Sequence, residues 1–104
     1  MAFLLVYITH PDMACAKKVT AHLLERRLIA CANVFPVDSA YWWQGRIEES
    51  KEVVSIVKTR AGNWDMLVSE VARIHPYKVP CIVRLDARAN EPFEEWVELQ
   101  TKGS

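Results

Sequence analysis

The chain has 104 residues, enough for one domain with a modest core, and its composition of 51% apolar and 25% charged residues is ordinary for a globular protein. The 13 Lys and Arg residues balance the 13 Asp and Glu residues. This balance argues against nucleic acid as the main partner, because phosphate binding needs a basic excess. We therefore expect a single domain over residues 1–104 that binds no nucleic acid.

The first nine residues, Met1 to Thr9, are apolar but lack the basic segment and the small-residue cleavage site of an export signal. They are also too few to span a bilayer. A buried strand over residues 3–9 explains them better. From this we expect a cytoplasmic protein with no membrane partner.

The three cysteines form neither a disulfide framework nor a zinc motif, since their number is odd and no two are closely spaced. Cys31 and Cys81 fall inside apolar runs, and the usual place of a thiol in such a run is the core. We expect both to be small core residues.

Residues 12–27 are predicted to form an amphipathic helix, capped by Thr9 or Asp12. His22 falls outside the apolar stripe, where we expect it to be solvated. The stripe consists of Ala16, Val19, Thr20, Leu23 and Leu24.

A long hairpin follows. The second strand begins near Ile29, and Pro36 in its middle indicates a bulge or an edge position, because proline cannot donate a ladder hydrogen bond. The turn is predicted at Gln44-Gly45, where glycine tolerates positive φ. The returning strand, residues 46–59, is apolar from Val53 onward. Each arm of about 14 residues would be about 45 Å long, so the hairpin should extend beyond a domain with a radius of gyration near ~13 Å.

The second half of the chain repeats the pattern of helix and strand. Gly62-Asn63 is predicted to end the strand and cap a helix that runs to His75, where Pro76 stops it. An extended connector over residues 75–80 leads to a strand over residues 81–86. Asn90 should then cap a short last helix, anchored by Phe93, Trp96 and Val97.

The order β-α-β-β-α-β indicates an α+β domain of the ferredoxin-like type, a four-stranded antiparallel sheet with two helices on one face. The strands are apolar throughout rather than at alternate positions. The second face of the sheet should therefore also be buried, and self-association through this face and the aromatic hairpin is the economical explanation.

Few residues suggest catalysis. The sequence has no nucleophile-elbow motif and no glycine-rich phosphate loop, so we expect neither an enzyme nor an organic cofactor. His10, Cys15 and His75 are metal-ligating residue types, but no two have the close spacing of a chelating motif.

A ligand cleft is the other candidate site. Glu52, Lys58 and Tyr77 could converge with the hairpin tryptophans, Trp43 among them, at a junction between subunits. Alternatively, Glu52 and Lys58 are edge charges that deter aggregation.

Several motifs, in this order, resemble those of the CutA divalent-cation tolerance proteins. They are Leu28-Ile29-Ala30-Cys31-Ala32-Asn33 before a proline, Tyr41-Trp42-Trp43-Gln44-Gly45, Glu52 ahead of Val57-Lys58-Thr59, and His75-Pro76-Tyr77-Lys78-Val79-Pro80. The resemblance extends from Phe3 to Leu99. It implies a ferredoxin-like subunit in a tight homotrimer, with Tyr41, Trp42 and Trp43 of each hairpin packed on a neighbouring subunit.

The resemblance also implies a role in metal response. Members of the family are described as binding copper, and His75 matches a motif histidine linked to metal. Ile8 and Ile74 stand where some members have a thiol and a second histidine. His10, which comes close after the first strand, is a candidate substitute ligand.

We therefore expect a trimeric module that binds copper or another divalent cation through His75 and His10. The alternative is a trimeric small-ligand-binding signalling or scaffold protein whose effect on cation tolerance is indirect. The sequence identifies no protein partner.

Overall fold

The computed structural model describes residues 3–102, and its element order confirms the predicted ferredoxin-like α+β fold. The strands are arranged in the sheet as β2-β3-β1-β4, with every neighbouring pair antiparallel. A short 3₁₀ turn, Ala61–Asn63, precedes α2. The elements are β1 (Phe3–His10), α1 (Met13–Glu25), β2 (Cys31–Trp43), β3 (Arg46–Arg60), α2 (Trp64–Ile74), β4 (Ile82–Ala87) and α3 (Glu91–Gln100).

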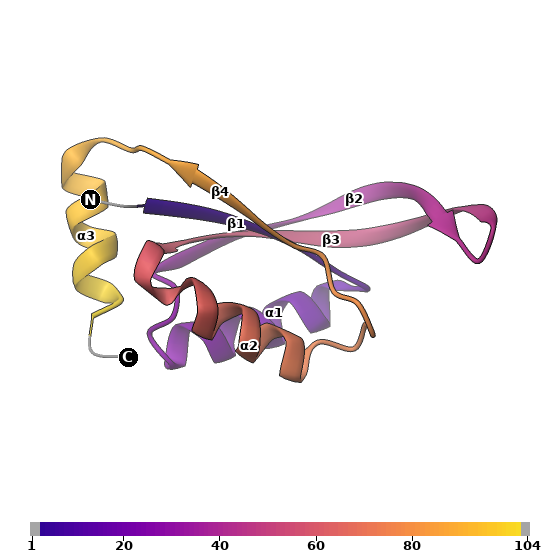
Figure 1. Cartoon of the computed structure of the whole chain (residues 1–104), viewed down its shortest axis with the longest axis horizontal. Coiled ribbons are helices and arrows are strands. Elements are labelled where there is room, and N and C mark those ends of the chain that lie inside the picture. Colours follow the sequence, from indigo (N-terminus) through magenta and orange to yellow (C-terminus); the bar gives the residue numbers. More distant parts are fainter. Residues whose placement is uncertain (1–2, 103–104) are drawn as a thin grey trace.

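Helices α1 and α2 cover one face of the sheet, and α3 lies at the end opposite the hairpin tip (Figure 1). The core between sheet and helices comes from alternate strand positions, because successive strand side chains point to opposite faces. None of the helices within residues 3–102 is long and apolar enough to cross a membrane. The core includes Leu4, Val6, Ile8, Val19, Leu23, Val57, Leu67 and Val71.

Helix α1 begins and ends with standard caps. The Asp12 carboxylate accepts a hydrogen bond from the Cys15 backbone N–H at 2.8 Å, as one of the two predicted caps. At the other end Arg27 takes a left-handed φ of 58°, and the Leu28 N–H donates to the Leu23 carbonyl. This is a Schellman termination.

The hairpin matches its prediction at the turn and along its length. Gln44 and Gly45 have φ values of 51° and 77°, as a two-residue type I′ turn requires. Pro36 pairs with Val53 in continuous register on the edge strand β2, so it marks an edge and not a bulge. The molecule measures 44 × 24 × 21 Å, and the hairpin extends beyond the rest of the chain (Figure 1). Its tip leaves Trp42 and Trp43 72% and 56% exposed.

The sheet face away from the helices lies open in the single chain. Strand β1 is not fully buried as predicted: Leu4, Val6 and Ile8 are, whereas Leu5 and Tyr7 on the other face are half-buried. Beside them Val83 and Leu85 of β4 are exposed. The burial of this face in a trimer remains a prediction.

Both predicted asparagine caps lie at the N-cap position, but neither side chain makes a capping hydrogen bond. The Asn63 amide instead donates to the carbonyls of Arg27 and Leu28 and to Thr59 Oγ1. The 3₁₀ turn before α2 explains this, because it gives Asn63 helical dihedral angles in place of the extended ones that capping requires.

Three further predictions about burial are wrong. Cys81 is exposed because it lies just before β4, outside the sheet, and Cys31 is half-buried because it is the first residue of the edge strand β2. Leu24 and Trp96 are also exposed in the single chain. His22 is not simply solvated, since its Nε2 lies 3.4 Å from Glu70 Oε1 on α2.

Candidate functional site

The two predicted metal ligands, His10 and His75, lie against each other. His10 ends β1 and His75 follows α2, and the topology places both ends at the same edge of the core. Their ring centroids are 5.3 Å apart. Both side chains are buried, at 0% and 7% exposure.

His10 contacts two side chains from other elements of the fold. Its Nε2 lies 2.8 Å from Ser55 Oγ on β3, and its Nδ1 lies 3.9 Å from Cys15 Sγ in the first turn of α1. Burial, together with the nearby His75, lowers the pKa of His10 to about 4. The imidazole is therefore neutral near pH 7.

His75 is held by backbone atoms on both sides of its ring. Nε2 donates to the Thr9 carbonyl at 2.7 Å, and Nδ1 accepts from the Tyr77 N–H at 3.1 Å. This pair of bonds fixes the neutral tautomer with hydrogen on Nε2. Ligation of a metal by His75 would need one of these bonds to open, so its predicted role as a ligand remains untested.

Tyr77 and Glu52, two of the four predicted cleft residues, are brought together. The Tyr77 hydroxyl donates to Glu52 Oε2 at 2.7 Å, and its ring lies 4.8 Å from that of His75. Burial and the adjacent Glu52 carboxylate raise the pKa of Tyr77. This contact joins the connector after α2 to the base of the hairpin.

Trp43 and Lys58, the other two cleft residues, lie elsewhere in the single chain. Trp43 pairs with Arg46 at the hairpin tip. Arg46 lies six positions before Glu52 on β3, or about 20 Å along the strand. Lys58 lies six positions from Glu52 in the other direction and donates to the Asn33 side chain. Their convergence across subunits stays a prediction.

Ser55 is the site residue to which the sequence assigned no role, and Cys15 was a metal-ligating residue type with no partner at chelating spacing. Ser55 is a polar residue among the helix-facing positions of β3, where Val53 and Val57 are its apolar neighbours. Asp12 stands three residues before Cys15, so its cap fixes the thiol's backbone over the end of β1. The polar residue within an apolar strand and the cap three residues before the thiol are the two sequence features that could have indicated Ser55 and Cys15.

The donor set fits a soft metal ion only in part. His10, Cys15 and His75 supply imidazole and thiol groups, which suit copper and zinc. Within residues 3–102, however, no group of three or more His, Cys, Asp or Glu residues is arranged to hold a metal ion.

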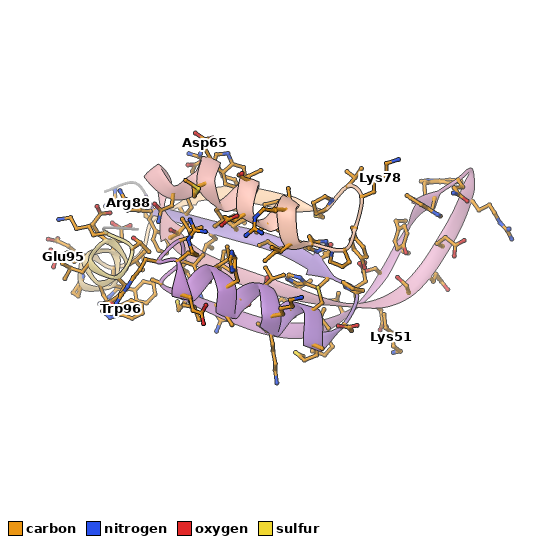
Figure 2. The ribbon with its side chains drawn as sticks, turned by 90° about the horizontal axis from the view of Figure 1, so that it is seen from below. Lys51, Asp65, Lys78, Arg88, Glu95 and Trp96 are labelled. Carbon is orange, nitrogen blue, oxygen red and sulfur yellow. The ribbon has the colours of Figure 1, made fainter. Side chains whose placement is uncertain are left out.

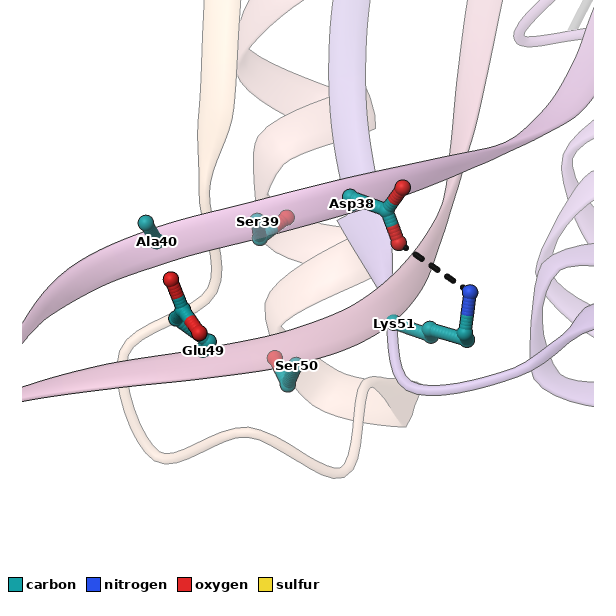
Figure 3. Close-up of a pocket in the computed structure, with 6 residues that line it drawn as sticks. All are labelled: Asp38, Ser39, Ala40, Glu49, Ser50 and Lys51. Carbon is teal, nitrogen blue, oxygen red and sulfur yellow. Dashed lines mark hydrogen bonds and ion pairs between the residues drawn. The ribbon is translucent and has the colours of Figure 1, made fainter.

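A hollow of about 560 Å³ lies along the outer hairpin, away from the histidines (Figure 3). Two of the residues that line it form an ion pair, in which the Lys51 ammonium lies 3.2 Å from the Asp38 carboxylate. Lys51 and Lys78 point outward from the ribbon (Figure 2). The hollow lies along the curved strands β2 and β3, and none of the predicted site residues lines it. It is lined by Asp38, Ser39, Ala40, Glu49, Ser50 and Lys51.

Comparison with known proteins gives a consistent result. The family model described as CutA1 divalent ion tolerance protein matches residues 4–100. A divalent-cation tolerance protein CutA from Pyrococcus horikoshii is 46% identical over 100 residues, covering 95% of this chain and 98% of the relative. A CutA protein from Homo sapiens is 35% identical and covers 92% of this chain and 55% of the relative.

Solved structures agree with the sequence relatives. The crystal structure of CutA1 from Pyrococcus horikoshii has a TM-score of 0.92 and 45% identity, covering 95% of this chain and 98% of that one. A CutA from Archaeoglobus fulgidus, described as a periplasmic divalent cation tolerance protein, has a TM-score of 0.94 and 36% identity, covering 96% and 99% of the two chains.

Proposed function

The chain belongs to the CutA1 divalent ion tolerance family, and from this we propose that it acts as a homotrimeric module that binds copper or another divalent metal ion. The observation that carries the metal proposal is the contact between the buried rings of His10 and His75, 5.3 Å apart, with the Cys15 thiol beside them. The imidazole and thiol groups of these residues are preferred ligands of copper and zinc.

The trimer proposal is supported by apolar surface that the single chain leaves uncovered. The hairpin tip carries Trp42 and Trp43, both more than half exposed, and the open sheet face carries Val83 and Leu85. Large apolar side chains left exposed in this way are typical of interaction sites. A second copy is the simplest partner, because the hairpin extends beyond its own chain.

We propose a binding role and not catalysis. A hydroxyl 2.8 Å from an imidazole, as in Ser55 and His10, has the spacing of an activated nucleophile. Both residues are, however, buried, with Ser55 at 1% exposure. A substrate would have no access to the hydroxyl in this arrangement.

Titration of the purified chain with Cu(II) and Zn(II), followed by calorimetry and native mass spectrometry, tests the metal proposal. We expect one ion per chain, and we expect His75→Gln to abolish binding. His22→Gln is the matched control, since His22 lies on α1 and contacts Glu70 instead of the cluster. Unchanged binding in His75→Gln would remove the proposed site.

A small-ligand role is the second candidate, and the contact between Tyr77 and Glu52 favours it. This hydroxyl–carboxylate pair borders His75 and joins the connector to the hairpin, where a neighbouring subunit could close a cleft. If metal uptake proves weak and non-stoichiometric in a clean trimer, the effect on cation tolerance is indirect and this candidate takes precedence.

A further inference from the structure

Helices α1 and α2 lie side by side over the sheet, and a cluster of charged side chains joins them (Figure 1). Glu70 of α2 is at its centre, with its side chain only 9% exposed. Its Oε1 pairs with the Arg26 guanidinium, and its Oε2 accepts a hydrogen bond from Arg73 Nε at 2.8 Å. His22 Nε2 lies 3.4 Å from Oε1. This Glu70 cluster is on the side of the sheet away from the open face, so assembly through that face would leave it accessible.

The Glu70 carboxylate fixes the direction of both guanidinium groups. The Arg26 and Arg73 side chains are themselves 50% and 59% exposed, and ordering long side chains of this kind costs rotamer entropy. Here each guanidinium is bonded to one oxygen of the same carboxylate, so both are ordered before any ligand binds. A ligand that meets preordered donors loses less affinity to their ordering.

Several N–H groups of the cluster have no hydrogen-bond acceptor within residues 3–102. Arg26 bonds Glu70 only through Nη1, so its Nε and Nη2 form a complete two-donor fork. Arg73 uses Nε toward Glu70 and Nη2 toward His22, and it keeps Nη1. When His22 Nε2 accepts from Arg73, the imidazole proton is on Nδ1 and is a further donor.

These donors suit an oxyanion with more than two oxygens. The hydrogen bond from Arg73 lowers the pKa of Glu70 to about 2, so two guanidinium groups face one carboxylate and the net charge is positive at neutral pH. An arginine fork binds two oxygens of a carboxylate or a phosphate. A carboxylate is fully engaged by Arg26 alone, whereas a phosphate group has further oxygens for the other donors. The cluster therefore favours phosphate.

We propose that Arg26, Arg73 and His22 form a binding site for a phosphate group, either the free ion or a phosphate monoester. Arg26 supplies the fork, and Arg73 and His22 supply the remaining donors. Glu70 is the positioning residue. The site goes beyond the proposed metal function, because it lies between the two helices and uses none of the candidate metal ligands.

The test is an NMR titration of the full chain at pH 7 and constant ionic strength, with the arginine Nε–H signals as the readout. We expect inorganic phosphate and phenyl phosphate to shift the Arg26 and Arg73 signals with saturation. Benzoate, the matched carboxylate, should bind at least about 10-fold more weakly. The tighter of the two phosphates shows whether the site takes the free ion or a monoester.

Single substitutions locate the site. Arg26→Gln should weaken phosphate binding by about 10–100-fold, the usual effect of removing a charged hydrogen-bond partner. Arg27→Gln is the matched control and should bind as the parent does, since Arg27 contacts Gln100 and not the cluster. Circular dichroism checks that each variant is folded.

Glu70→Gln distinguishes an ordered site from a diffuse basic surface. The substitution removes a negative charge, so a diffuse surface would bind phosphate more tightly. An ordered site should bind it several-fold more weakly, because the guanidinium groups lose the charged acceptor that directs them. Arg26→Gln still tests the site if Glu70→Gln does not fold.

Three results would overturn the inference: unchanged phosphate affinity in Arg26→Gln, an equal loss in Arg27→Gln, or tighter binding in Glu70→Gln. Each of them leaves the metal proposal standing, because metal binding is measured separately with His75→Gln. Conversely, a chain that binds no metal could still bind phosphate at the Glu70 cluster.

Discussion

Glu70 joins the two helices that cover the sheet. Its carboxylate accepts a hydrogen bond from Arg73 Nε at 2.8 Å, pairs with the Arg26 guanidinium and lies 3.4 Å from His22 Nε2. The hydrogen bond from Arg73 is the main reason that the pKa of Glu70 is lowered to about 2. Helix packing is therefore coupled to the charge of one carboxylate.

This coupling predicts a pH dependence of stability. The folded-state pKa lies below the ordinary value of 4.5, so the stabilisation is complete above about pH 4.5 and is lost as pH falls from there toward 2. Glu70→Gln should flatten this part of the profile, measured by urea unfolding between pH 7 and 2. Glu25→Gln removes an exposed carboxylate of α1 and should leave the profile unchanged. A profile for Glu70→Gln as steep as that of the parent would contradict the assignment.

At the scale of the elements, Asn63 connects three segments. Its buried amide donates to the end of α1, through the Arg27 and Leu28 carbonyls, and to Thr59 at the end of β3. The same residue type at the start of α3, Asn90, is exposed and makes no capping bond. Both asparagines directly precede a helix, but the Asn63 side chain donates hydrogen bonds to distant segments, whereas the Asn90 side chain makes no capping bond.

Alanine substitution at these two positions should therefore give different results. We expect Asn63→Ala to cost about 1–3 kcal/mol of unfolding free energy, because buried carbonyls lose a donor. Asn90→Ala should cost less than about 0.5 kcal/mol. Chemical denaturation followed by circular dichroism measures both. Equal losses would show that position at the helix start, and not the long-range bonds, decides the effect.

At the scale of the whole molecule, the exposed hairpin tip and the open sheet face should govern assembly. Trp42 and Trp43 could each bury on the order of 200 Å² in a neighbouring subunit. That area corresponds to several kcal/mol before the costs of association. The proposed trimer should consequently depend on them.

We expect Trp42→Ser with Trp43→Ser to shift the proposed trimer toward monomers at micromolar concentration, with association weakened by more than about 100-fold. Sedimentation velocity and native mass spectrometry measure the oligomer. Met66→Ser is the control, since Met66 is an exposed apolar residue on α2, away from the hairpin. An intact trimer in the double variant, or a monomeric parent chain, would contradict the proposed assembly.

The candidate site was only partly accessible to sequence reasoning. His10 and His75 were identified as candidate ligands, and the structure places their rings in contact. The bonds that fix His75 to Thr9 and Tyr77 were not foreseen, because they depend on how the end of α2 meets the end of β1. The partners of His10 come from α1 and β3, 5 and 45 positions away in the chain.

The sequence by itself determined the order of strands and helices, the Asp12 cap and the Gln44-Gly45 turn, because periodicity, capping and positive φ are decided by residues close together in the chain. Only the tertiary structure decided which polar side chains meet, such as Asn63 with Leu28 and Glu70 with His22, and which apolar ones remain exposed, such as Trp96. These features depend on strand register and helix packing, which bring together residues that are distant in the chain.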